Sequence, residues 1–160
     1  KIVSQAHDAG VKVAWNPGHE ELSVGLESFK SVLTMVDVLI MNKEEGQLLT
    51  GKKKIQQMFK ALRTPGVVHV FTDGTEGSWV QRDELSAHAG TSGVRAVSRT
   101  GAGDAFGSGF VAMFIKTNDL KEALRVGTLS AESVIQHVGA KRGILKTWPS
   151  KRQTERIMIT

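Results

Sequence analysis

Hydrophobic and polar residues form blocks that predict alternating helices and strands in the first half of the chain. Apolar residues recur at helical spacing from Leu26 to Leu33, and the nearly continuous apolar run from Val36 to Met41 is typical of a buried parallel strand. We expect further helices over 1–9, from Asn42 to Gly51 and over 54–63, and strands over 11–15 and 67–72. This alternation indicates an α/β fold.

The second half predicts an antiparallel edge followed by two long helices. Residues 78–82 and 85–89 are expected to form a hairpin, with a short strand at 94–97 after it. Residues 106–115 are apolar nearly all round, which indicates a helix buried on most sides. The next helix is expected to begin at Asp119, with Glu122 as the reciprocal capping partner, and to stop at Gly139. Together these elements indicate an α/β layered domain with an antiparallel edge.

Composition limits the classes of protein that this chain can represent. Its 160 residues suffice for one domain with a core, and 21 Lys and Arg against 16 Asp and Glu give a net charge of +5, which suits a polyanionic ligand such as a nucleotide. The absence of cysteine excludes disulfide and thiolate metal sites and favours the cytoplasm. No apolar run reaches membrane-span length, and no basic cluster with aromatic residues outside the C-terminal tail points to nucleic acid.

The stretch Arg99-Thr100-Gly101-Ala102-Gly103-Asp104, just before the apolar run, carries the most chemical information. Glycines allow successive N–H groups to converge on one phosphate at the N-terminus of a helix. A carboxylate there would repel the phosphate, so Asp104 makes sense if it acts on an incoming hydroxyl group. The spacing fits neither the dinucleotide fingerprint nor a P-loop.

The longer string Thr-Gly-Ala-Gly-Asp-Ala-Phe, followed by Gly-Ser-Gly-Phe, resembles the C-terminal signature of the ribokinase-like (PfkB) carbohydrate and nucleoside kinases. Asn42-Lys43-Glu44-Glu45 matches the family's Asn-x-x-Glu motif, and Thr72-Asp73-Gly74-Thr75-Glu76-Gly77 matches its nucleotide loop. Asn16-Pro17 and Gly139-Ala140 are further landmarks. The resemblance covers the C-terminal half of such a kinase, and the sequence around Lys1 is typical of the middle of a helix. We therefore expect a piece of a longer protein.

The resemblance implies a three-layer α/β/α fold with a mostly parallel sheet. Residues 1–145 would be the nucleotide-binding and catalytic part, and 146–160 a basic terminal tail that is either solvated or a docking element. The implied reaction transfers the γ-phosphate of ATP to a hydroxyl group of a sugar or nucleoside, with Mg²⁺ bridging the phosphates. A different hypothesis is a truncated nucleotide-binding module without acceptor-dependent turnover, because the missing half would hold most acceptor contacts.

The resemblance also assigns roles to individual residues. Asp104 would be the general base, favoured in its charged form by the helix N-terminus. In the loop that begins at Gly101, the backbone N–H groups of Ala102, Gly103 and Asp104 would form an anion hole. Thr72, Gly74, Gly77 and Thr100 would border the nucleotide. Glu45 would organise Mg²⁺ through water, and Asn42 would reach the phosphates, although alone this pair reads as a helix cap and its capping-box partner.

One residue departs from the family pattern. The family usually has Asp two positions before the Thr-Gly of its signature, in many members as part of a monovalent-cation site, whereas this chain has Ser98. The departure puts activation by potassium in doubt. The resemblance further implies a homodimer for the full-length protein.

Overall fold

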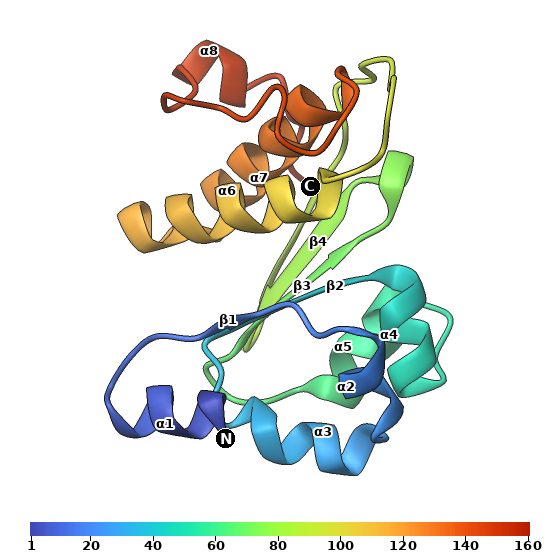
Figure 1. Ribbon diagram of the computed structural model, residues 1–160, viewed down its shortest axis with the longest axis vertical. Coiled ribbons are helices and arrows are strands. Elements are labelled where there is room, and N and C mark those ends of the chain that lie inside the picture. Colours follow the sequence, from blue (N-terminus) through green and yellow to red (C-terminus); the bar gives the residue numbers. More distant parts are fainter. The chain divides into compact units, whose positions relative to one another are not determined.

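The structure is a computed structural model that describes all residues from 1 to 160. The chain folds into two compact units (Figure 1). Unit 1 contains Lys1–Thr72 and Trp79–Ser86, and unit 2 contains Asp73–Ser78 and Ala87–Thr160. None of the helices combines the length and the apolar character needed to cross a membrane.

A five-stranded sheet has the strand order β1-β2-β3-β4-β5. Its strands are β1 Ala14–Trp15, β2 Val38–Asn42, β3 Val68–Thr72, β4 Ser78–Arg82 and β5 Leu85–Ala89. The first three pair in parallel, with Val38 opposite both Ala14 and Val68. Only Asp83 and Glu84 join β4 to β5, and a two-residue connection makes this pair an antiparallel hairpin. The predicted mostly parallel sheet with an antiparallel edge hairpin is confirmed.

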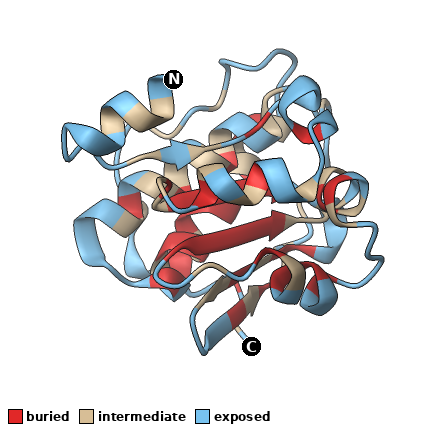
Figure 2. Ribbon diagram, turned by 90° about the horizontal axis from the view of Figure 1, so that it is seen from below, coloured by how far each residue is buried: buried red, intermediate tan, exposed pale blue.

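Unit 1 has a core built on β2 and β3, which are buried along most of their length (Figure 2). Its helices are α1 Ile2–Asp8, α2 His19–Ser23, α3 Leu26–Leu33, α4 Lys43–Thr50 and α5 Ile55–Leu62. Helices α2 to α5 contribute buried residues to this core, and α1 contributes none. In α5, Ile55, Met58, Phe59 and Leu62 are spaced as one helical face, and all four are buried. Their core partners include Phe29, Leu39, Met41 and Phe71.

Unit 2 is built on two long helices, α6 Ala102–Thr117 and α7 Leu120–Ile135, which pack against each other. It also contains the short 3₁₀ helix η1 Gly74–Glu76 and the short helix α8 Lys151–Thr154. The contact between α6 and α7 requires small residues: a Cβ on Gly109 would overlap Ser130 Oγ, and one on Gly127 would lie 3.0 Å from the ring of Phe106. Close packing of these helices therefore depends on glycine at both positions.

Four expectations about unit 2 are wrong. Residues 94–97 form no strand, because the N–H groups of Val97 and Ser98 donate to the Ile135 carbonyl at 2.7 and 3.1 Å instead of to a neighbouring strand. Helix α6 is buried along one stripe and not on most sides, and Ile115 is 76% exposed. Asp119 caps α7, but Glu122 bonds to Arg125 Nη1 at 2.6 Å, and α7 ends at Ile135, before Gly139.

The basic C-terminal segment 146–160 packs on unit 2. Ile157 is fully buried, and its carbonyl accepts a hydrogen bond from Arg125 Nε at 3.3 Å. Thr160 and His88 exchange two backbone hydrogen bonds of 2.9 Å each, and Ile159 forms an antiparallel bridge with Ala89. The end of the segment therefore lies beside β5, with Ile157 buried and Met158 exposed.

Candidate active site

The loop before α6 turns at Gly101, which adopts a left-handed backbone conformation with φ of +83°. A Cβ at this position would lie 2.7 Å from both Cα and Cβ of Ala140. Only glycine combines this φ with such close approach of the backbone. The contact places the Gly139-Ala140 motif directly beside the glycine-rich loop.

The first turn of α6 presents two backbone donors that the protein does not use. The N–H of Ala105 donates to the Gly101 carbonyl at 2.9 Å, and the N–H of Ala102 donates to the Arg99 carbonyl at 3.2 Å. The N–H groups of Gly103 and Asp104 have no partner in the protein. Unpaired N–H groups at the start of a 16-residue helix form a partly positive site that suits an anion.

Asp104 stands in the same first turn, and its side chain is exposed. Its carboxylate forms no hydrogen bond or ion pair within the protein, in contrast to Asp119, whose Oδ1 caps the start of α7. Asp104 is therefore not held as a capping residue. Its carboxylate is available to accept a hydrogen bond from a bound molecule.

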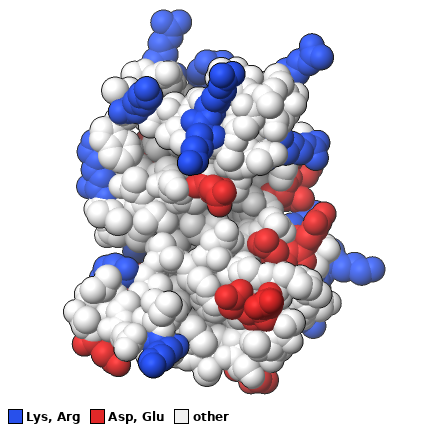
Figure 3. All heavy atoms as spheres, viewed as in Figure 1, with Lys and Arg blue, Asp and Glu red and all other residues white.

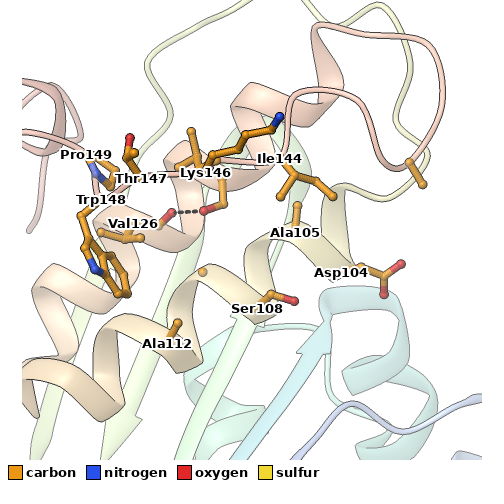
Figure 4. Close-up of a pocket in the computed structure, with 14 residues that line it drawn as sticks. Asp104, Ala105, Ser108, Ala112, Val126, Ile144, Lys146, Thr147, Trp148 and Pro149 are labelled. Atoms are coloured by element: carbon orange, nitrogen blue, oxygen red, sulfur yellow. Dashed lines mark hydrogen bonds between the residues drawn. The ribbon is translucent and has the colours of Figure 1, made fainter.

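A pocket of about 470 Å³ lies along α6, between this helix, Val126 of α7 and the segment from Ile144 to Pro149 (Figure 4). Its walls are largely apolar and include the ring of Trp148. Asp104 contributes to the rim, but its carboxylate points away from Trp148 and Val126 (Figure 4). The carboxylate therefore does not lie inside this pocket.

The predicted nucleotide loop of unit 2 is fixed at both ends. The N–H of Asp73 donates to the Gly77 carbonyl at 2.9 Å, which closes the loop around η1. Gly77 has φ of +92°, and a Cβ there would overlap the carbonyl oxygen of Ala89. His88 Nε2 lies 2.8 Å from the Glu76 carbonyl oxygen. Gly74 and Gly77 thus belong to a tight loop that approaches the end of β5.

Unit 1 places three predicted site residues at the carboxyl ends of two neighbouring strands. Asn42 ends β2 and lies opposite Thr72, which ends β3. Asn42 Oδ1 accepts the Glu45 N–H, and Glu45 Oε2 accepts the Asn42 N–H, each at 2.8 Å. This capping box uses only one oxygen of Glu45. Open α/β sheets bind ligands at the carboxyl ends of their strands, so the cap and a ligand-binding role are compatible.

The predicted site residues are distributed over both units. Unit 1 holds Asn42, Glu45 and Thr72, and unit 2 holds Gly74, Gly77 and the loop 100–104. No three His, Cys, Asp or Glu side chains come together as a metal-binding group.

Basic side chains gather on the C-terminal segment of unit 2, at the top of Figure 3. The exposed Lys and Arg residues from position 141 onward are Lys141, Arg142, Lys146, Lys151, Arg152 and Arg156. Lys141 and Arg142 directly follow Ala140, which touches the position of Gly101. They add positive charge near the start of α6, where an anion would be attracted.

A polar contact of unit 2 that was not predicted from the sequence joins Glu132 of α7 to Ser92. A signal was present, because Glu132 follows Leu124 and Thr128 at intervals of four residues and so falls on a buried stripe. A charged residue on such a stripe is unusual.

Comparison with known proteins identifies the group to which the chain is related. Residues 4–148 match the pfkB family of carbohydrate kinases. The ribokinase of Haemophilus influenzae is 28% identical over 152 residues, which cover 91% of this chain and 46% of that enzyme. The chain thus spans about half the length of the curated relatives it matches.

Solved structures confirm the predicted three-layer α/β/α fold of the ribokinase type. Adenosine kinase from Sinorhizobium meliloti has a TM-score of 0.78 and 24% identity, covering 89% of this chain and 45% of that one. A putative ribokinase II from E. coli in complex with ATP and Mg²⁺ has a TM-score of 0.75 and 20% identity, covering 89% and 48%. The motifs, the fold and the match over residues 4–148 agree, and the chain belongs to the pfkB family of carbohydrate kinases.

Proposed function

We propose that this chain is the nucleotide-binding and catalytic part of an ATP-dependent kinase that phosphorylates a hydroxyl group of a sugar or nucleoside. One observation carries the proposal: an unpaired carboxylate, Asp104, shares the first turn of α6 with two unpaired N–H groups. The turn is held in place by the contact of Gly101 with Ala140. A base and an anion site are thereby combined in one turn of helix.

Asp104 acts as the general base in this proposal. As the acceptor hydroxyl attacks the γ-phosphorus, its proton moves to the Asp104 carboxylate, the new O–P bond forms, and the bond between the γ-phosphorus and the β–γ bridging oxygen breaks, which releases ADP. The carboxylate has no competing hydrogen bond within the protein. General-base catalysis of this kind contributes about 10²- to 10⁴-fold to a rate.

The N–H groups of Gly103 and Asp104 stabilise the charge that develops on the transferred phosphoryl group. The N–H of Ala102, the third donor that the sequence predicts, already donates to Arg99 at 3.2 Å, so it contributes only by exchanging that long bond for one to the anion. Preorganised donors stabilise a transition state because they require no reorientation during the reaction. We assign the nucleotide itself to Thr72, Gly74, Gly77 and Thr100.

A magnesium ion fits this chain as an ion that is coordinated mainly by the phosphates of the nucleotide. The chain does not surround such an ion with a full set of protein ligands. A single carboxylate, Glu45, stands beside Asn42 at the end of β2, and Mg²⁺ commonly keeps several waters and binds to proteins through one or two carboxylates. When bound, the ion would neutralise charge on the phosphates. The E. coli relative with ATP and Mg²⁺ supports this assignment.

The acceptor is assigned only by class, because the relatives include both a ribokinase and a nucleoside kinase. The second candidate function is a nucleotide-binding module without acceptor-dependent turnover. This function is favoured because the chain covers only about half the length of the relatives it matches. Contacts to the acceptor that lie outside these residues would be missing. A base without a positioned acceptor gives little rate enhancement.

The two functions differ in the release of ADP. We would measure ADP formation from ATP and Mg²⁺ with and without a panel of sugars and nucleosides, for the wild type, Asp104→Asn and Asp119→Asn. Asp119→Asn makes the same chemical change at the start of α7, and because Asn also caps helices, it should leave both fold and rate unchanged.

A kinase shows acceptor-dependent ADP release that falls at least about 100-fold in Asp104→Asn and stays within about twofold of wild type in Asp119→Asn. ATP binding without acceptor-dependent release supports the nucleotide-binding module. Absence of any nucleotide binding by the folded wild type contradicts both functions.

A further inference from the structure

Glu132 is a buried carboxylate that the proposed reaction does not use. It is only 6% exposed, on the buried face of the last turn of α7. Its two oxygens accept one hydrogen bond each from Ser92: the N–H donates to Oε1 and the hydroxyl donates to Oε2, both at 2.6 Å. No Lys, Arg or His pairs with it. Burial of a carboxylate without a cationic partner costs free energy, and these two hydrogen bonds are the interactions that offset this cost.

The segment bound by Glu132 has no regular structure of its own. Residues 90–99 contain neither helix nor strand, so side-chain and backbone bonds to neighbours fix their course. Thr91 Oγ1 donates to the Thr75 carbonyl at 3.4 Å, in the middle of the nucleotide loop. The N–H groups of Val97 and Ser98 donate to the carbonyl of Ile135.

One turn of α7 therefore holds both ends of residues 92–98. Glu132 binds the beginning of this segment, and Ile135, three residues further along the helix, binds its end. Residue 91 touches the nucleotide loop 73–77, and residue 99 leads into the loop 100–104. The segment thus connects the two loops of unit 2 that we assign to the nucleotide and to the transferred phosphate.

We propose that Glu132 is a positioning residue for the nucleotide site: it anchors Ser92 and thereby sets the spacing between the loop 73–77 and the loop 100–104. The proposal rests on the proposed nucleotide-binding function. It predicts that loss of the Glu132 carboxylate weakens nucleotide binding even where α6 and α7 remain folded.

The test compares Glu132→Ala, Glu132→Gln and Ser92→Ala with the control Thr128→Val. Thr128 lies one turn before Glu132 and is equally buried, but its hydroxyl has no partner, so valine removes nothing that holds the loop. We would measure ADP affinity by calorimetry, the melting temperature, and hydrogen exchange of the Ser92, Val97 and Ser98 amides. All affinities are measured well below the lowest melting temperature.

Glu132→Ala should speed exchange at Ser92 and weaken ADP binding by about tenfold or more, because it removes two hydrogen bonds to a charged group. Ser92→Ala removes one of them and should weaken binding by about threefold to tenfold. Glu132→Gln keeps an oxygen for the Ser92 N–H and an amide for its hydroxyl, so it should restore affinity to within about threefold of wild type. Thr128→Val should match the wild type in affinity.

A lower melting temperature for Glu132→Ala with unchanged ADP affinity would show a purely structural residue and overturn the proposal. Unchanged exchange at Ser92 would overturn it as well. If the folded wild type binds no ADP, the proposed function fails and this inference fails with it. If the wild type binds ADP and all variants bind equally, only the role of Glu132 is refuted.

Discussion

At the scale of single residues, His69 shows how burial couples the fold to pH. Its ring lies in β3 and is 4% exposed, and Nε2 has no hydrogen-bond partner. Burial lowers the pKa of His69 from 6.5 to about 4, although hydrogen bonds to the backbone of Leu62 and Val67 and the charge of Asp83 act in the opposite direction. The folded state therefore keeps this histidine neutral at pH values where the unfolded chain protonates it.

The consequence is a loss of stability as pH falls from 6.5 towards 4. The unfolded state binds the extra proton in this window, so His69 should lower the free energy of unfolding by about 2 kcal/mol between pH 7.5 and pH 5. Urea unfolding at the two pH values measures the difference. In His69→Leu this part of the pH dependence should vanish, and an equal decrease in that variant would assign it to other groups.

Gly101 is the residue on which the geometry of the phosphate site depends most. Gly101→Ala should cost about 1–3 kcal/mol of stability and abolish ADP binding, because the new methyl group meets Ala140 in a left-handed backbone conformation. Gly139→Ala is the matched control: φ is +95°, but open space surrounds the new Cβ. Gly139→Ala should have the same backbone strain as Gly101→Ala but retain nucleotide binding, and calorimetry with ADP would measure that binding. Equal binding by both variants would contradict the role of the contact.

At the scale of elements, the sequence pattern was sufficient to predict helices and strands whose buried residues recur at one clear spacing. Residues such as Ile55, Met58 and Leu62 place α5, and the alternation at 78–89 places the hairpin with its turn at Asp83. The pattern failed for α6, because its apolar residues outnumber the positions that its neighbours cover. It also failed at 94–97, where the amides bind the end of α7, a long-range contact that local periodicity does not contain.

The packing of α6 on α7 predicts different effects of alanine at two glycines of α6, one in the contact and one outside it. Gly109→Ala should destabilise the protein by about 1–3 kcal/mol, because the added Cβ overlaps Ser130 Oγ, whose hydroxyl is bonded to the Val126 carbonyl at 2.7 Å and cannot move freely. Gly103→Ala places its methyl group in open space and should change stability by less than about 1 kcal/mol. Thermal unfolding compares them, and a similar loss in both would indicate a helix-wide effect instead of local overlap.

At the scale of the whole molecule, the predicted site residues fall in three separate parts of the chain, and these parts belong to two units. Motif order predicts residues 42–45, 72–77 and 100–104, and the structure shows what each does locally: a capping box, a closed loop and an open helix start. Sequence alone did not reveal the contacts of Gly101 with Ala140 or of Ser92 with Glu132. Both join residues about 40 positions apart, and such pairing follows from tertiary packing.

The central claim is that the start of α6 binds the phosphates of a nucleotide, and amide NMR tests it most directly. Titration with ADP and Mg²⁺ should shift the amide resonances of Gly103 and Asp104, whose N–H groups are unpaired. The amides of Lys121 and Glu122 provide an internal control at the start of α7, because Asp119 already binds them at 2.8 and 3.1 Å. Binding of ADP that leaves Gly103 and Asp104 unshifted would contradict the claim.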